Sequence, residues 1–130
     1  MEPQENARVL EFPTSTIWFD EDGILCSRSK KAPPSTIEES KKTLEEFNKF
    51  LNGKKVCMLL DTTNSGQSSK ETREFAAAEF PKFTKAIAFF SASPLGKMVA
   101  NIFFSIVKQP YPVKMFNDEK SAKAWLKQYL

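Results

Sequence analysis

Histidine is absent from this 130-residue chain, and cysteine occurs only twice. Without histidine the commonest metal ligand and general base is missing, and no Ser-His or Cys-His catalytic pair can form within the chain. Cys26 and Cys57 lie in separate apolar runs without a C-x-x-C motif, so we expect buried thiols in a reducing compartment. These absences predict a protein with no metal, no cofactor and no enzymatic activity.

Long apolar segments are also absent. The most apolar helical pattern, residues 95–107, is shorter than a membrane span and is interrupted by Lys97 and Asn101. The first residues are acidic and contain no apolar core of signal-peptide length. We therefore expect a cytoplasmic protein with no transmembrane segment.

The net charge is small and unevenly distributed. The 19 basic and 16 acidic residues give a net charge of +3, which is too small to indicate nucleic-acid binding. Residues 1–65 carry 9 basic and 11 acidic side chains, whereas residues 66–130 carry 10 and 5. We interpret the basic second half as a solvated face, and an anionic partner is the alternative.

Apolar periodicity and turn residues predict one α/β domain over residues 14–130, preceded by an extension or edge segment at 1–13. The acidic turn ending in Gly23 joins two strands into an N-terminal β-hairpin. Continuous apolar runs of the kind found in central strands follow further along the chain. The expected strands are 16–19, 24–26, 56–60, 86–90 and 112–116.

Four helices alternate with these strands. Each begins at a residue that can cap a helix: Ser35 or Thr36, then Ser68 with Glu71, then Ser93 before Pro94, and finally Asn117 or Asp118. The element order is β-β-α-β-α-β-α-β-α, and we expect right-handed crossovers between the parallel strands of a mixed, mostly parallel sheet.

The junction after the central strand 56–60 is the best candidate for function. Loops at the carboxyl ends of parallel strands are where ligands usually bind. Asp61 could act as a general base or bind a polar group, but such an aspartate more often caps its loop. Arg73 could pair with Asp61 or contribute to an anion site. The candidate interaction or regulatory loop consists of Asp61, Thr62, Ser65, Ser68, Ser69 and Arg73.

Two further regions are candidates. Ser91, Ser93 and Asn117 follow neighbouring strands at the same edge and could frame a cleft. The helix at 95–107 is apolar on more than one side, so it could pack in the core, form a homodimer surface or contact a lipid or other apolar ligand. Its candidate residues are Met98, Phe103, Phe104 and Val107.

Several motifs together resemble those of a known family. They are 16–24, Gly53-Lys54-Lys55, Leu60-Asp61, 69–73, Ser93-Pro94, and 116–119 through Ala124-Trp125-Leu126. With these motifs the chain is similar to SpoIIAA-like small domains of the STAS/SEC14 type, and more narrowly to a poorly characterised bacterial branch.

The resemblance implies a SpoIIAA-like (STAS) βα superhelix. Better-known members bind a partner kinase and are switched by phosphorylation of a serine in an Asp-Ser-Ser-Gly-like motif. Here Gln67 and Lys70 replace the flanking aspartate and glycine of that motif, so a helix cap is the main interpretation of Ser68 and a phosphoserine is the alternative. The leading functional hypothesis is a non-enzymatic domain that acts through protein contacts, with lipid or apolar-ligand carriage as the alternative.

Overall fold

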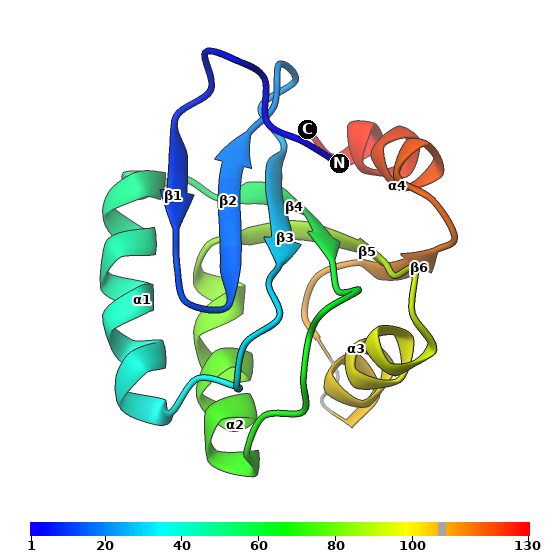
Figure 1. Ribbon diagram of the computed structural model, residues 1–130. Coiled ribbons are helices and arrows are strands. Elements are labelled where there is room, and N and C mark those ends of the chain that lie inside the picture. Colours follow the sequence, from blue (N-terminus) through cyan, green and yellow to red (C-terminus); the bar gives the residue numbers. More distant parts are fainter. Residues whose placement is uncertain (107–108) are drawn as a thin grey trace.

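A six-stranded sheet forms the centre of the molecule (Figure 1). The computed structural model describes residues 1–106 and 109–130, and for residues 103–106 it describes the backbone only. The strands follow one another in the sheet in the order β1-β2-β3-β4-β5-β6. They comprise β1 (Val9–Glu11), β2 (Ser15–Phe19), β3 (Leu25–Ser29), β4 (Val56–Asp61), β5 (Thr84–Phe90) and β6 (Val113–Phe116).

The sheet is mixed. β1, β2 and β3 pair antiparallel, and β3 to β6 pair parallel. The helices are α1 (Ile37–Leu51), α2 (Lys70–Glu79), α3 (Pro94–Ile106) and α4 (Glu119–Leu126), with short 3-10 turns η1 (Phe80–Lys82) and η2 (Lys127–Tyr129). This α/β arrangement confirms the predicted element order, and β1 adds an edge strand before the hairpin.

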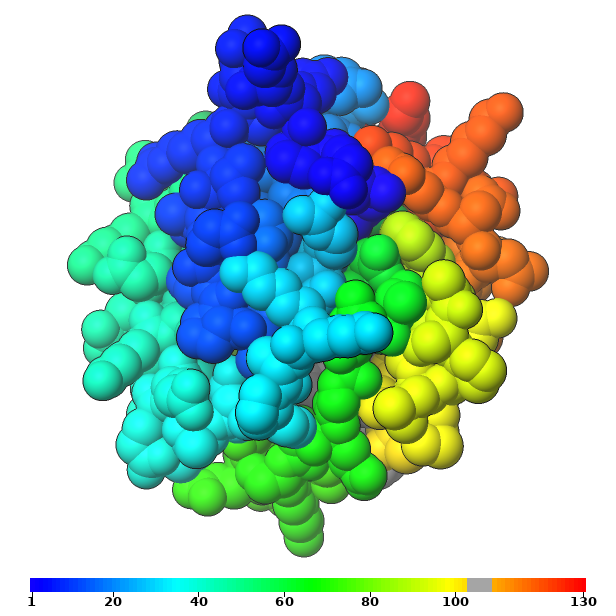
Figure 2. All heavy atoms as spheres, in the orientation of Figure 1, coloured from blue at the N-terminus to red at the C-terminus, as the bar shows by residue number. Residues whose placement is uncertain are grey.

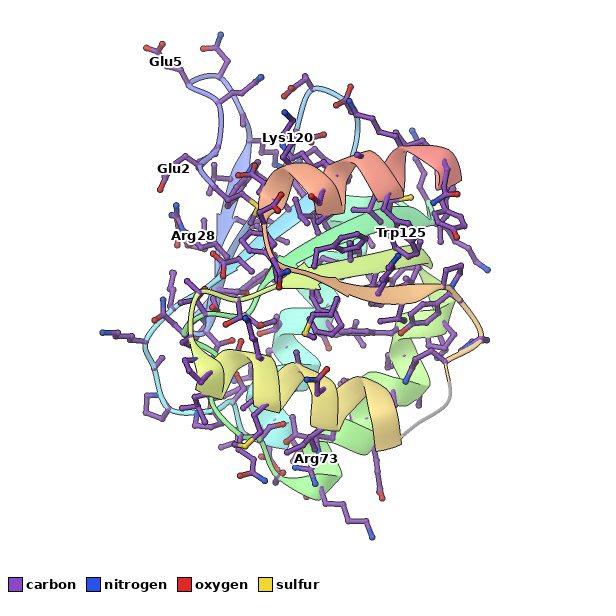
Figure 3. All side chains as sticks on the ribbon, turned by 90° about the vertical axis from the view of Figure 1, so that its right-hand side faces the viewer. Glu2, Glu5, Arg28, Arg73, Lys120 and Trp125 are labelled. Atoms are coloured by element: carbon purple, nitrogen blue, oxygen red, sulfur yellow. The ribbon has the colours of Figure 1, made fainter. Side chains whose placement is uncertain are left out.

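The helices cover both faces of the sheet. Figure 3 shows α4 on one side and α1, α2 and α3 on the other. Crossover helices on one face are expected when same-handed connections step across a sheet in one direction. Two apolar clusters result, one toward α1 with Phe47 and Met58, and one toward α4 with Trp18 and Leu126. Because β4 and β5 contribute to both clusters, they are covered on both faces, as their sequences predict.

Local sequence signals explain most element ends. Thr36 caps α1, and its side chain and that of Glu39 form the two bonds of a capping box. Asp118 caps α4. Gly23 has φ +81° in the β2–β3 turn, and Asn52 and Gly53 end α1 with positive φ. These residues fix where the helices and the hairpin begin and end.

Two local predictions need correction. Ser69, not Ser68, caps α2, because the Ser69 side chain accepts a hydrogen bond from the Thr72 amide. β3 also continues beyond Cys26 through Ser27, Arg28 and Ser29. The apolar pattern did not predict this extension, because these residues are polar. Within the described residues, no helix is long and apolar enough to cross a membrane.

Candidate functional site

Asp61 and Thr63 bind the end of β4 to its own loop. The Asp61 Oδ1 atom accepts hydrogen bonds from the Thr63 amide at 3.0 Å and the Thr63 hydroxyl at 2.6 Å. Thr63 Oγ1 in turn accepts from the Ala92 amide at 2.9 Å, and Ser93 Oγ donates to the Thr63 carbonyl at 2.7 Å. The β4–α2 loop is therefore joined to the β5–α3 loop by a local polar network.

The start of α3 lies directly against this loop. Thr62 Oγ1 lies 3.2 Å from the Gly96 carbonyl oxygen, to which it donates. A Cβ atom at Gly96 would lie 2.2 Å from the Thr62 carbonyl oxygen and 2.4 Å from Ser91 Oγ. Only glycine fits at this point of α3. Asp61 and Thr62 thus have structural roles at the carboxyl edge of the sheet, although both also line a cavity described below.

The serines before α2 have different environments. Ser69 caps the helix, whereas the Ser68 carbonyl accepts a hydrogen bond from Arg73. Arg73 therefore does not pair with Asp61, and the expected Asp61–Arg73 ion pair is wrong. Figure 3 places Arg73 beside α3 at the foot of the molecule. Ser65 and Ser68 line the same cavity as Asp61.

The three predicted cleft-edge residues are not equivalent. Ser91 Oγ donates to the Ser93 carbonyl at 2.8 Å, and Ser93 Oγ accepts from the Gly96 amide at 3.0 Å, so both serines organise the start of α3. Asn117 is exposed after β6 and lines neither of the two large cavities. Ser91 and Ser93 likewise line neither of these two cavities.

One of two cavities of similar volume is an apolar chamber between α1, α2 and the sheet. Its volume is about 280 Å³, near the lower end of the range for small-molecule sites. We use the name chamber for this cavity, whose apolar lining includes Ile17, Leu25, Leu44, Phe47, Met58, Phe75, Ala76 and Phe83. Glu79, which pairs with Lys82 at 3.0 Å, is the charged residue on its described wall.

A second, polar cavity of about 280 Å³ adjoins the chamber at the carboxyl ends of β3 and β4. We call this cavity the mouth. Figure 2 shows that the β3–α1 loop (cyan) and the β4–α2 loop (green), which both contribute to it, lie against each other at the surface. Its lining includes Ser29, Lys30, Asp61, Ser65, Ser68 and Thr72.

The chamber and the mouth share six lining residues, which we call the neck. Five of its six members carry hydroxyl groups: Thr14, Ser15, Ser27, Ser35 and Ser40, with Leu60 as the sixth. Strand register explains why the lining changes from apolar in the chamber to polar in the mouth. Ile17 of β2 pairs with Ser27 of β3, and Ser15 pairs with Ser29 one step closer to the mouth. Side chains on one face of a strand alternate, so the sheet face changes from Leu25 to Ser27 and Ser29 toward the mouth.

The charges near the mouth are largely compensated. Lys30 forms an ion pair with Glu11 and donates to the Phe12 carbonyl at 2.9 Å. The hydrogen bond from Lys30 is the main cause that lowers the pKa of the Glu11 carboxyl. Asp61 keeps one carboxylate oxygen, Oδ2, without a hydrogen bond among the described residues. No cluster of three or more potential metal-ligating residues occurs in the described chain.

Sequence reasoning missed the chamber and most of the neck. A signal was present in α1, where Ser40 and Thr43 share a helical face with the apolar Leu44 and Phe47. A similar signal was Ser27, two residues after Leu25 on the same face of β3. Hydroxyl groups on an otherwise apolar face indicate either buried partners or a lined cavity.

The apolar side chains of α3 that the structure describes are only partly buried. Leu95 is 56% exposed and Met98 is 49% exposed, so these residues of the predicted apolar stripe do not pack in the core. The side chains of Phe103 and Phe104 and the whole of Val107 lie outside the described residues. Val99 and Ile102 border a small cavity of about 30 Å³ beside Ser68 and Arg73.

Comparison with solved structures confirms the SpoIIAA-like fold. An uncharacterised protein of the DUF3478 family from Shewanella loihica PV-4, described as having a SpoIIAA-like fold, is similar over 97% of this chain and 99% of that one, with a TM-score of 0.60 and 20% identity. A protein of unknown function from Arthrobacter sp. FB24 matches 85% of this chain and 97% of its own at 23% identity, with a TM-score of only 0.32.

Comparison of sequences gives the family but no activity. No match is found among functionally curated proteins. The family model for a domain of unknown function, DUF7793, matches residues 17–130. This match begins inside β2 and includes every later strand and helix, so it contains most of the chamber and the mouth. The chain therefore belongs to the DUF7793 family.

Proposed function

We propose that this protein binds a single-chain amphiphile in the cleft between α1, α2 and the sheet, without catalysing a reaction on it. The observation that carries the proposal is the apolar chamber of about 280 Å³, which adjoins the mouth and shares the hydroxyl-bearing residues of the neck with it. An apolar chain would be removed from water in the chamber, while a polar group would stay in the mouth. This proposal develops the apolar-ligand alternative, but places the ligand on α1 and α2 instead of α3.

The packing of α2 supports this assignment. Thr72 is its only fully buried residue, although Phe75 and Ala76 face the sheet side and line the chamber. An apolar ligand would supply the contacts that these side chains lack, at about 25 cal/mol per Å² of apolar surface removed from water.

Calorimetric titration with decanoyl amphiphiles, kept below their micelle concentrations, tests the proposal. We expect saturable binding with one molecule per chain, and at least tenfold weaker binding to Ala76→Leu, which fills part of the chamber. Ala78→Leu is the matched control, because Ala78 is exposed on the same helix. Equal binding by wild type and Ala76→Leu, or no binding at all, would contradict the proposal.

A second candidate function is a protein contact through α3 and the neighbouring edge strand. The observation that favours it is the exposure of Leu95, Met98 and Met115 at 56%, 49% and 41%. Homodimer formation is the simplest form of this contact. Sedimentation of wild type and of Leu95→Ser/Met98→Ser over a concentration range tests it, and monomeric wild type at all concentrations would contradict the dimer.

A further inference from the structure

The neck presents hydroxyl groups that have no partner within the described chain. Thr14, Ser15, Ser27, Ser35 and Ser40 line both cavities, and none of their side chains forms a hydrogen bond with another described residue. Ser29, at the mouth, already accepts a hydrogen bond from the Asn64 amide at 2.9 Å. Each neck hydroxyl can both donate and accept a hydrogen bond. These hydroxyls therefore match a ligand group that also donates and accepts hydrogen bonds.

The cleft offers little to an anion. Lys30 is the only cationic residue among the described residues that line the two cavities, and it is engaged by Glu11 and by the Phe12 carbonyl. The free Oδ2 atom of Asp61 at the mouth repels a carboxylate or a phosphate.

Acidic side chains also offset the positive ends of the two nearby helix dipoles. α1 begins with Glu38 and Glu39, and the Glu39 side chain accepts a hydrogen bond from the Thr36 amide. α2 has Glu71 in its first turn. Acidic side chains in a first helical turn offset the positive end of the helix dipole, so these termini add no net attraction for an anionic group.

From this combination we infer that the ligand is a single-chain amphiphile with a neutral, hydroxyl-bearing head group of the monoacylglycerol class. This inference rests on the proposed function and specifies its ligand. The head group lies in the neck against Ser27 and Ser40, where its hydroxyls exchange hydrogen bonds with the unpartnered side chains. The acyl chain extends into the chamber toward Phe47 and Phe75.

The chamber volume limits the chain. The cavity of about 280 Å³ is close to the lower end of the range for small-molecule sites. We therefore use probes with a medium-length chain of ten carbons.

Three probes with the same chain length and different head charges test the inference. They are 1-monodecanoylglycerol, decanoate and decyltrimethylammonium, titrated calorimetrically at pH 7.5 below their micelle concentrations. We expect 1-monodecanoylglycerol to bind at least ten times more tightly than decanoate, which the Asp61 carboxylate repels. We also expect it to bind more tightly than decyltrimethylammonium, whose head group can neither donate nor accept hydrogen bonds with the neck hydroxyls. Tighter or equal binding of decanoate or of the ammonium probe overturns the inference and leaves the proposed function standing. Absence of binding by all three overturns both.

The double variant Ser27→Ala/Ser40→Ala separates the head-group contact from the chain contact. It removes two neck hydroxyls and leaves the apolar chamber wall in place. We expect about fivefold to tenfold weaker binding of 1-monodecanoylglycerol and little change for decanoate. Urea unfolding of the same protein establishes that it is folded. Unchanged binding of 1-monodecanoylglycerol by the folded variant would overturn the assignment of the neck.

Discussion

Replacing Ala76 by leucine adds three carbon atoms to the wall of the chamber. Ala76 lies on α2 and lines the cavity of about 280 Å³. The three added carbon atoms therefore occupy part of that space. Alanine and leucine have similar helix propensities, so the change in stability reports on packing.

The expected effect is stabilisation of the ligand-free protein. Burial of each added carbon contributes about 0.8 kcal/mol, which gives roughly 2.4 kcal/mol before the loss of leucine rotamer freedom, about 0.5–1 kcal/mol, is subtracted. Part of the side chain stays near the opening, so we expect the free energy of unfolding to rise by about 1 kcal/mol. This value lies within the range that cavity-filling substitutions commonly give.

Urea unfolding followed by circular dichroism measures the effect. Ala78→Leu is the control, since Ala78 is exposed on the same helix, and we expect a change within about 0.5 kcal/mol there. Destabilisation of Ala76→Leu by more than about 1 kcal/mol, with no change in the control, would show that the chamber has no room and would refute the reasoning.

Three further substitutions and one chemical modification test the surrounding structure. Gly96→Ala would place its Cβ 2.2 Å from the Thr62 carbonyl oxygen. We therefore expect urea unfolding to show a loss of about 1–3 kcal/mol of stability, although alanine normally favours a helix. Stabilisation would contradict the close approach. Ser69→Ala should lower the free energy of unfolding by about 1 kcal/mol, since Ser69 caps α2. Ser68→Ala should change it by less than about 0.5 kcal/mol. A larger loss for Ser68→Ala than for Ser69→Ala would show that Ser68 is the cap. Burial raises the pKa of Cys26 to about 12, so iodoacetamide at pH 8 should modify this thiol only after unfolding. Mass spectrometry measures the modification, and rapid alkylation of the folded protein would contradict the burial of Cys26.

The fold was predictable because its signals are local. The buried runs of β4 and β5, the capping residues Thr36 and Asp118, and the turn at Gly23 each act within a few residues in sequence. Such signals determine where elements begin and end, and the alternation of strands and helices then implies a mostly parallel sheet. The segment 1–13 could be predicted only as an extension or edge segment, because the pairing of β1 with β2 depends on tertiary contact more than on its own short sequence.

The cleft was less predictable because it depends on the distance between elements. The sequence shows Ser40 and Ser27 as polar residues on apolar faces, but it does not show that α1 and α2 leave a chamber between them. Likewise, adjacent serines 68 and 69 are equally suitable as caps by composition. The backbone decides in favour of Ser69, whose extended conformation directs its side chain to the Thr72 amide. Sequence reasoning thus located the carboxyl edge of the sheet and missed the cavity beside it.

The most direct test of the account is a titration of ¹⁵N-labelled protein with 1-monodecanoylglycerol, followed by amide chemical shifts. We expect the largest shift changes around the neck and chamber, at Ser27, Ser40 and Ala76. Shift changes concentrated instead at the exposed Leu95 and Met98 of α3 would contradict it and would place the apolar contact on the other candidate surface.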